Sequence, residues 1–195
     1  MTQKEKLEAR ERIIKAVLEI IGQKGAVKFT VREISIVANV NLSAVNYYFR
    51  STRNLLNEVE AYFAEKVQEI SKILTEENLD PRIRLINWSK AMMELLTKNT
   101  GIIWIMANKI THKGNPGVLI EKLLEDNNYI LEKLISELTG NTDEQYIAFK
   151  IMQLVSDISF PFIMCNGLGK NLNQDFNDST VIERYSNMII NSILL

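Results

Sequence analysis

The chain has 195 residues, 46% of them hydrophobic, and a formal net charge of −1, which fits one compact unit or a small domain joined to a larger one. No apolar run approaches the roughly 18 residues of a membrane span, and no apolar stretch follows the charged start. The lone Cys165 excludes an internal disulfide and, with the single His112, leaves too few ligands for an ordinary zinc site. We therefore expect a cytoplasmic protein without signal peptide, metal or cofactor.

Charge is unevenly distributed along the chain. Residues 1–56 contain ten Lys and Arg against five Asp and Glu, a formal charge of +5. Residues 57–195 contain thirteen against nineteen, a formal charge of −6. A basic segment on an acidic body suits a polyanionic partner, although chance clustering of surface charge explains the same numbers.

The first predicted helix runs from about residue 6 to residue 23. Its apolar residues recur at spacings of three, four and seven, which places them on one face. Gly22 and Gly25 are expected to end it. Thr30 and Glu33 then form the pattern of a capping box, in which each side chain accepts a hydrogen bond from the other residue's amide. A short second helix is predicted to begin there.

A tight turn separates this second helix from a third. Asn39 suits the left-handed backbone that such a turn requires. Asn41 is expected to cap the third helix, which runs through Tyr48, and Ser51 is expected to cap a fourth that continues towards Asn78. Two helices joined by a three-residue turn are the helix-turn-helix arrangement.

The remaining sequence also favours helices, since proline is scarce and strand patterns are nearly absent. Helices are predicted over residues 81–98, 102–111, 116–138, 143–165 (kinked at Pro161) and 179–194. The sequence thus predicts an all-α protein. We expect a helix-turn-helix domain in residues 1–56, with the fourth helix bridging onward from about residue 52, and a larger helical domain in residues 57–195.

The third helix carries side chains suited to DNA. In helix-turn-helix proteins the second helix of the pair enters the major groove, and its first residues meet base edges. Asn46 can pair with adenine, Ser43 reads bases without strong preference, and Leu42 can touch a thymine methyl group. The groups suited to phosphate oxygens are Thr30, Tyr47, Tyr48, Arg50 and Arg53. Judged on spacing alone, the two tyrosines are equally well explained as aromatics that pack between helices and expose their hydroxyls to water.

An ungapped pattern runs through residues 10–56. It consists of Ile14, Ala16, Gly25, Thr30-Val31-Arg32-Glu33-Ile34, Val40, Tyr47-Tyr48-Phe49, Ser51 and Leu55-Leu56. This pattern resembles the N-terminal domain of the TetR family of bacterial transcriptional repressors. The resemblance implies a homodimer on a near-palindromic DNA operator, and a helical C-terminal domain whose ligand releases the DNA. The expected DNA-contact residues are Thr30, Arg32, Asn41, Leu42, Ser43, Asn46, Tyr47, Tyr48, Arg50, Thr52 and Arg53.

Three positions depart from the family's pattern. Its turn Gly is Asn39, and its Ser at the start of the recognition helix is Asn41; the local backbone tolerates both. Its Lys after Ser51, which typically contacts phosphate, is Thr52. Arg50 or Arg53 would then have to supply the missing charge.

Large aromatic and Met side chains in the C-terminal part suit an ordinary core, or a cavity for an apolar or aromatic ligand. The resemblance favours a cavity lined by some of them. Asp157 is the most conspicuous polar candidate, and it can anchor a ligand cation, line a dimer interface or face water. The candidate ligand-binding residues are Trp88, Met92, Trp104, Phe149, Met152, Asp157 and Phe160.

The last two helices are the usual dimer interface of the family. Their apolar side chains lie at helical spacing, and such a stripe needs a partner if it is exposed and none if it is buried. The stripe consists of Ile147, Ile151, Leu154, Ile158, Tyr185, Met188, Ile189, Ser192 and Ile193.

Two classes of function follow from these observations. We expect a ligand-responsive, sequence-specific DNA-binding transcriptional regulator, a repressor released from its operator by a small apolar or aromatic molecule. The alternative is a helical ligand-binding or protein-interaction module that has lost DNA binding, which Thr52 favours. We expect no enzyme, because His112 reads as a solvated loop residue, Cys165 as a small buried apolar group, and no catalytic set surrounds either.

Overall fold

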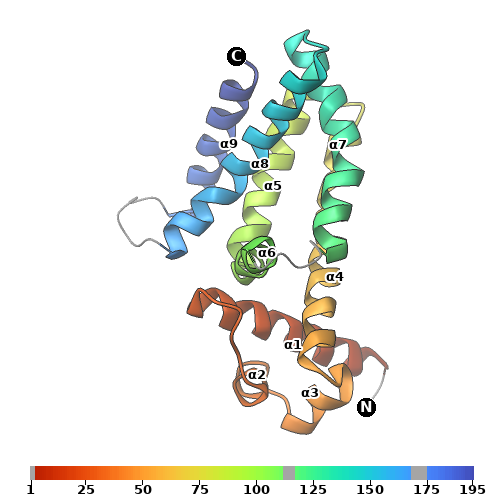
Figure 1. The fold of residues 1–195 in the computed structure, drawn as a ribbon, viewed down its shortest axis with the longest axis vertical. Helices are drawn as coiled ribbons and strands as arrows, with labels where there is room; N and C mark the ends of the chain where they lie inside the picture. The colour runs from red at the N-terminus through yellow and green to blue at the C-terminus, as the bar shows by residue number, and fades with distance from the viewer. Residues whose placement is uncertain (1–2, 112–116, 168–174) are drawn as a thin grey trace. The chain divides into compact units, whose positions relative to one another are not determined.

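The structure is a computed structural model that describes residues 3–111, 117–167 and 175–195. Every regular element in these residues is a helix, which confirms the predicted all-α class (Figure 1). In chain order they are α1 (Gln3–Lys24), α2 (Val31–Val37), α3 (Leu42–Phe49), α4 (Thr52–Ser71), the 3-10 helix η1 (Lys72–Thr75), α5 (Pro81–Lys98), α6 (Gly101–Thr111), α7 (Gly117–Thr139), α8 (Glu144–Gly167) and α9 (Ser179–Ile193).

The chain forms two compact units. The first consists of Met1–Glu65 and Asn99–Leu119, and the second of Lys66–Lys98 and Ile120–Leu195. The chain therefore passes between the units three times, and α6 belongs with the N-terminal helices although all of α5 precedes it. The domain boundary predicted at residue 56 separates the expected DNA-binding segment from the expected ligand-binding and dimerisation segment. It remains a prediction.

The core of the first unit is built around α1. Its inner face, which includes Ile13, Val17 and Ile21, is fully buried, and α1 packs against both α2 and α6. Packing against α6 is close, because a Cβ on Gly101 would lie 2.1 Å from the carbonyl oxygen of Leu18. These contacts fix α6 to the N-terminal helices.

The prediction that Gly22 ends α1 is wrong. The helix continues to Lys24, and Gly22 is instead a packing residue, since a Cβ there would lie 2.2 Å from the hydroxyl oxygen of Thr100. Gly25, with a φ of +61°, follows the last helical residue and adopts the left-handed conformation typical of a helix end.

The turns around α2 and α3 follow the predicted chemistry with one exception. The capping box at Thr30 is confirmed, with the Glu33 amide donating to the Thr30 hydroxyl at 3.2 Å and the Thr30 amide donating to the Glu33 carboxylate at 2.8 Å. Asn39 has a φ of +51°, as the turn requires. Asn41 occupies the N-cap position of α3, but its side chain makes no capping hydrogen bond.

The fourth helix is shorter than predicted. Ser51 caps α4 as expected, accepting a hydrogen bond from the Asn54 amide at 3.1 Å. The α-helix ends at Ser71, and a 3-10 turn continues the chain to Thr75, where the prediction extended the helix towards Asn78. The buried stripe nevertheless continues to Leu74, which is fully buried.

In the second unit, α5, α8 and α9 pack against one another. Leu85 and Met93 of α5 and Ile190 of α9 are fully buried there. Asp178 caps α9 by accepting a hydrogen bond from the Thr180 amide at 2.8 Å. Pro161 lies inside α8, as predicted. His112 lies outside the described residues, and the surroundings of the Cys165 side chain are likewise not described.

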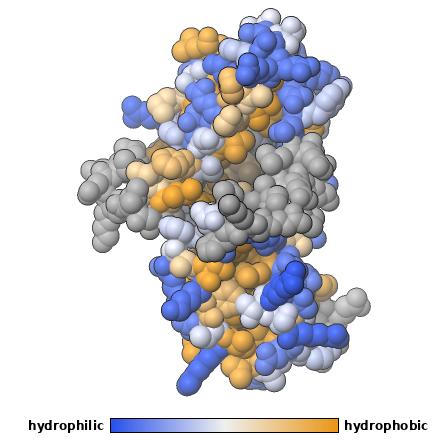
Figure 2. Space-filling view, viewed as in Figure 1, coloured by the Kyte–Doolittle hydropathy of each residue, from blue (hydrophilic) through white to orange (hydrophobic). Residues whose placement is uncertain are grey.

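The predicted dimer stripe is mostly buried within its own chain. Its members Ile147, Ile151, Leu154, Ile158, Ile189 and Ile193 lie in the core, whereas Met188 and Ser192 are exposed. The apolar side chains that α8 exposes are different ones, namely Phe149 at 57%, Met152 at 59%, Val155 at 43% and Phe160 at 55%. We call these four residues, with Met188 of α9, the outer apolar face. Figure 2 shows that apolar side chains reach the surface.

The stretch Glu144–Met164 of α8 is long and apolar enough to cross a membrane by length and composition, contrary to the expectation that no such run exists. Core helices of soluble proteins share this composition. In α8 the buried stripe and the outer apolar face together account for it.

Candidate nucleic-acid interface

The inner face of α3 anchors the helix in the first unit. Val45 and Phe49 are each only 3% exposed, so Phe49 packs the small core as its place in the sequence suggests. The opposite face is free. Leu42 is 50% exposed and Tyr47 is 70% exposed, and Asn46 is exposed beside them. The helix thus presents base-reading side chains on a rigid support.

The two tyrosines of α3 differ in their surroundings. Tyr48 is half-buried, whereas Tyr47 is mostly exposed and meets Tyr48 edge-on, with ring centroids 5.3 Å apart. Such an edge-to-face pair stabilises both rings. Apart from this contact, Tyr47 is 70% exposed, so burial in a core does not account for it.

The start of α2 carries a second group of the predicted contacts. The Thr30 hydroxyl is already engaged with Glu33, and Arg32 is exposed. The Lys24 ammonium holds the pKa of the Glu33 carboxyl below its usual range, assisted by the amide and hydroxyl of Thr30. Glu33 therefore stabilises the start of α2 through its contacts with Thr30 and Lys24.

The start of α4 carries the third group. Arg50 takes a φ of +60° at the C-cap of α3, and the Thr52 and Arg53 side chains are exposed. The Arg50 and Arg53 side chains form no hydrogen bond or ion pair with another described residue, so both cations face solvent. The position where the TetR pattern has a lysine carries only the Thr52 hydroxyl.

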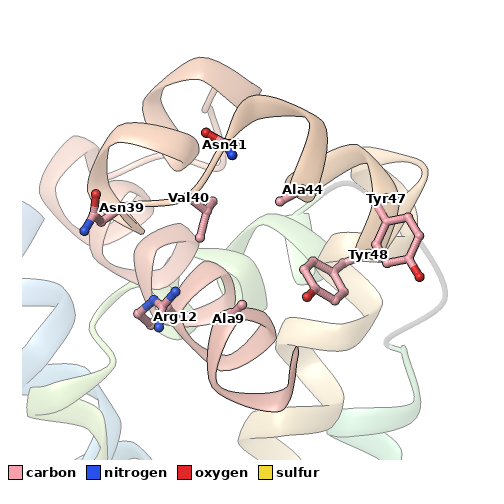
Figure 3. A pocket seen from close by; sticks show the side chains of 8 residues that line it. All are labelled: Ala9, Arg12, Asn39, Val40, Asn41, Ala44, Tyr47 and Tyr48. Carbon is pink, nitrogen blue, oxygen red and sulfur yellow. The ribbon is translucent and has the colours of Figure 1, made fainter. Parts of the chain in front are cut away.

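A groove of about 550 Å³ lies along the flank of α3, between this helix and α1 (Figure 3). We call it the α1–α3 groove. It brings three predicted contact residues, Asn41, Tyr47 and Tyr48, together with five that the sequence reasoning did not select: Ala9, Arg12, Asn39, Val40 and Ala44. Only Arg12 among those five is charged. A signal for it existed in the basic run Arg10-Glu11-Arg12 ahead of the apolar stripe of α1.

The candidate ligand-binding residues are not gathered around one described cavity. Trp104 lies in the first unit, where its ring faces Gly25, and the other six lie in the second. Phe149, Met152 and Phe160 belong to the outer apolar face of α8. Trp88 is buried and Met92 half-buried on α5.

Two polar atoms on α5 are buried without a hydrogen-bond partner in the described structure. They are the indole nitrogen of Trp88 and the hydroxyl oxygen of Ser89, whose residues are 4% and 0% exposed. Buried polar groups are almost always hydrogen-bonded, so these two atoms are exceptions among the described residues.

Asp157 is half-buried on α8, and burial raises the pKa of its carboxyl. Its backbone carbonyl accepts a hydrogen bond from the Tyr185 hydroxyl at 3.1 Å. Burial also raises the pKa of Tyr185, with a smaller contribution from the Asp157 charge. Among the residues whose positions are described, no cluster of His, Cys, Asp and Glu could hold a metal ion.

A helix with a buried inner face, an exposed polar outer face and cations at its end, preceded by a short helix and a tight turn, is the arrangement of helix-turn-helix DNA-binding domains. Residues 13–59 match the model of the bacterial regulatory proteins of the tetR family. This segment of the chain is thus similar to the N-terminal domain of these regulators. The search of curated proteins found no match to the sequence.

Solved structures of several transcriptional regulators are similar in fold to most of the chain, and PfmR is described as a TetR family member. PfmR from Thermus thermophilus is 16% identical with a TM-score of 0.68, and the match covers 92% of this chain and 97% of that one. HlyIIR, a haemolysin II transcriptional regulator, is 20% identical with a TM-score of 0.64 over 94% and 97%. FadR, a fatty acid degradation regulator from Bacillus halodurans, is 14% identical with a TM-score of 0.65 over 93% and 94%. At these identities the likeness establishes the fold alone.

Proposed function

We propose that this regulator is a cytoplasmic repressor that binds a near-palindromic operator through α3 and leaves it when a small molecule binds the second unit. The observation that carries the DNA-binding part is the orientation of α3. Its core anchors leave Ser43, Asn46 and Tyr47 facing solvent. Arg50 and Arg53 lie next along the chain, where they can meet phosphates that fix the register.

The proposed repressor is a homodimer, and the outer apolar face of α8 and α9 supports this. Soluble proteins rarely expose contiguous apolar surface of this kind without a partner. A second copy that packs its own outer apolar face against this one would cover both at once, as twofold symmetry requires. The four-helix contact of α8 and α9 would then use Phe149, Met152 and Phe160, which the sequence reasoning assigned to ligand binding.

The proposed effector binds near α5. The unpaired indole N–H of Trp88 and the hydroxyl of Ser89 favour a ligand that carries a hydrogen-bond acceptor on an otherwise apolar body. Binding would favour a conformation in which the two recognition helices no longer match half-sites about 34–36 Å apart, which shifts the population away from DNA. The proposed coupling between effector binding and DNA release runs through α4, which crosses from the first unit into the second.

The proposal is tested by fluorescence anisotropy with DNA selected from a random pool and with the region upstream of the protein's own gene. We expect a twofold-symmetric site and an affinity that falls steeply with salt. Asn46→Ala should relax the preference at one base pair in each half-site, at a cost of about 1–3 kcal/mol per site. The control Asn78→Ala lies at an exposed position in the second unit and should bind as the wild type does. Weak binding without sequence or salt dependence would refute the proposal.

The second candidate function is a tetR-type protein that has lost DNA binding, and Thr52 is the observation that favours it. This alternative predicts that Tyr47→Ala and Arg50→Ala leave cellular behaviour unchanged. The repressor proposal predicts that both variants release transcription of the regulated gene, so a reporter fused to the selected operator separates the two.

A further inference from the structure

The α1–α3 groove contains a cation whose position is fixed and whose terminal nitrogens are unused. The Nε of Arg12 donates to the carbonyl oxygen of Ala38 at 3.3 Å, which ties the guanidinium to the end of α2. No described residue accepts a hydrogen bond from the two terminal nitrogens of Arg12. Arg10, two residues earlier in α1, differs because it forms an ion pair with Glu58. Arg12 is therefore the arginine on this part of α1 whose charge remains available.

The lining of the groove suits an anion. None of its eight residues is acidic, and its polar groups are the guanidinium, the amides of Asn39 and Asn41, and the tyrosine hydroxyls. The Asn41 side chain forms no capping hydrogen bond with α3. In Figure 3 the Tyr48 hydroxyl points towards the helix that carries Ala9 and Arg12. All of these groups can donate to a phosphate oxygen.

The shape of the groove suits a chain rather than an enclosed small molecule. Arg12, Asn39, Asn41 and Tyr47 are exposed, so the groove is open to solvent along its length. Its floor includes the small apolar residues Ala9, Val40 and Ala44, which can contact a sugar. A helix with its side chains is about 10–12 Å across and the major groove about 12 Å wide, so a helix inserted there meets a phosphate strand along its flank.

We infer that the α1–α3 groove seats a backbone phosphate of the operator and that Arg12 is its principal cation. The inference rests on the proposed DNA-reading role of α3. It assigns to α1 a contact that supplies the positive charge lacking at Thr52, in addition to Arg50 and Arg53. Arg12 acts here as a positioning residue, because a phosphate contact sets the register of α3 without reading a base.

The test compares Arg12→Gln with the wild-type full-length protein on the selected operator. The side-chain nitrogen of Gln takes the place of the arginine Nε, so the bond to the Ala38 carbonyl can persist while the charge is lost. We expect the slope of log affinity against log salt to become shallower by about 0.9 for each protomer, and the affinity to fall about tenfold per contact at 0.1 M salt. Arg12→Lys should retain the wild-type slope. Lys72→Gln, in η1, removes the same charge from the second unit and should change neither.

Several outcomes would overturn the inference. An unchanged slope and affinity in Arg12→Gln would remove Arg12 from the interface while wild-type binding upholds the proposed function. A lower melting temperature with an unchanged slope would make Arg12 only a structural cap of α2. Calorimetric titration with inorganic phosphate, if it showed tight binding that Arg12→Gln abolishes, would assign the groove to a soluble anion instead. Absence of salt-dependent DNA binding in the wild type would refute the proposed function itself.

Discussion

At the scale of single residues, the helix-turn-helix depends on a few polar side chains that replace missing backbone hydrogen bonds. Thr30 and Glu33 satisfy the first amides of α2, and Lys24 completes this group with a 2.6 Å ion pair to Glu33. Asn39 accepts a left-handed φ that most residues avoid. These local interactions determine where α2 begins and how the chain turns into α3.

The first prediction concerns Glu33→Gln and its dependence on pH. The pKa of Glu33 is lowered in the folded protein, first by Lys24 and then by Thr30, so its ionised form stabilises the fold above the unfolded value near 4.5. This contribution is lost as the pH falls through the lowered folded value. The melting temperature of Glu33→Gln should therefore lie below that of the wild type at neutral pH, and the gap should close below pH 4.5. Glu69→Gln, which breaks a surface ion pair but no cap, should have a smaller effect at neutral pH. A gap that widens in acid would contradict the assignment.

At the scale of elements, α6 is attached to the N-terminal helices at positions where a side chain does not fit. Gly101 meets the backbone of Leu18, and Gly22 meets the side chain of Thr100. The Glu60 carboxylate, 7% exposed, accepts a hydrogen bond from Lys109 of α6 at 2.5 Å. These contacts make α6 part of the unit that contains the proposed DNA-reading helix α3.

The second prediction concerns Gly101→Ala. The added Cβ would lie 2.1 Å from a backbone oxygen, so α1 and α6 must move apart. We expect the free energy of unfolding to fall by about 1–3 kcal/mol, as in other overpacked cores, measured by urea denaturation. Gly22→Ala is the matched control. Its nearest obstacle is the Thr100 hydroxyl, which can rotate, and the Gly101 backbone nitrogen lies farther away at 3.1 Å, so its loss should be smaller. Equal losses in the two variants would show that the backbone contact at Leu18 is not the limiting one.

The elements also show what sequence alone could and could not predict. The capping box, the turn at Asn39 and the Ser51 cap were predictable because each depends on neighbours in the chain. The placement of α6 in the first unit was not, because Gly22 and Gly101 approach each other only in three dimensions. The face of α8 that is buried was also undetermined: the helix is apolar on two sides, and periodicity cannot choose between Ile151 and Met152. Arg12 was missed because the basic pair Arg10 and Arg12 does not show in sequence which of the two lines a groove and which pairs with Glu58.

At the scale of the whole molecule, the outer apolar face is the proposed site of self-association. Phe149, Met152, Val155 and Phe160 are exposed on α8, and Met188 is exposed on α9. A twofold contact would present two recognition helices to DNA at a fixed spacing. Dimerisation and operator recognition are therefore expected to fail together.

The third prediction concerns Met152→Glu. A charge in the middle of the proposed dimer contact should weaken the dimer about 30-fold or more, as loss of an interfacial hot spot does. Sedimentation equilibrium should show monomers at concentrations where the wild type is dimeric, and operator affinity should fall in parallel. Gln68→Glu adds the same charge at an exposed site on α4 in the second unit and should leave the dimer intact. A dimeric Met152→Glu would place the interface elsewhere.

The insertion of α6 into the first unit limits how the protein can be divided. A fragment that stops after Glu65 would contain every proposed DNA-contacting residue and yet lack Ile102, Ile103 and Ile105, which are buried in the full chain. The apolar side of α1 that packs on α6 would then face water, and such a fragment is prone to aggregate. The first unit is built from two separate segments of the sequence, so a recombinant version of it must also include the segment from Asn99 onward, joined by a linker in place of Lys66–Lys98.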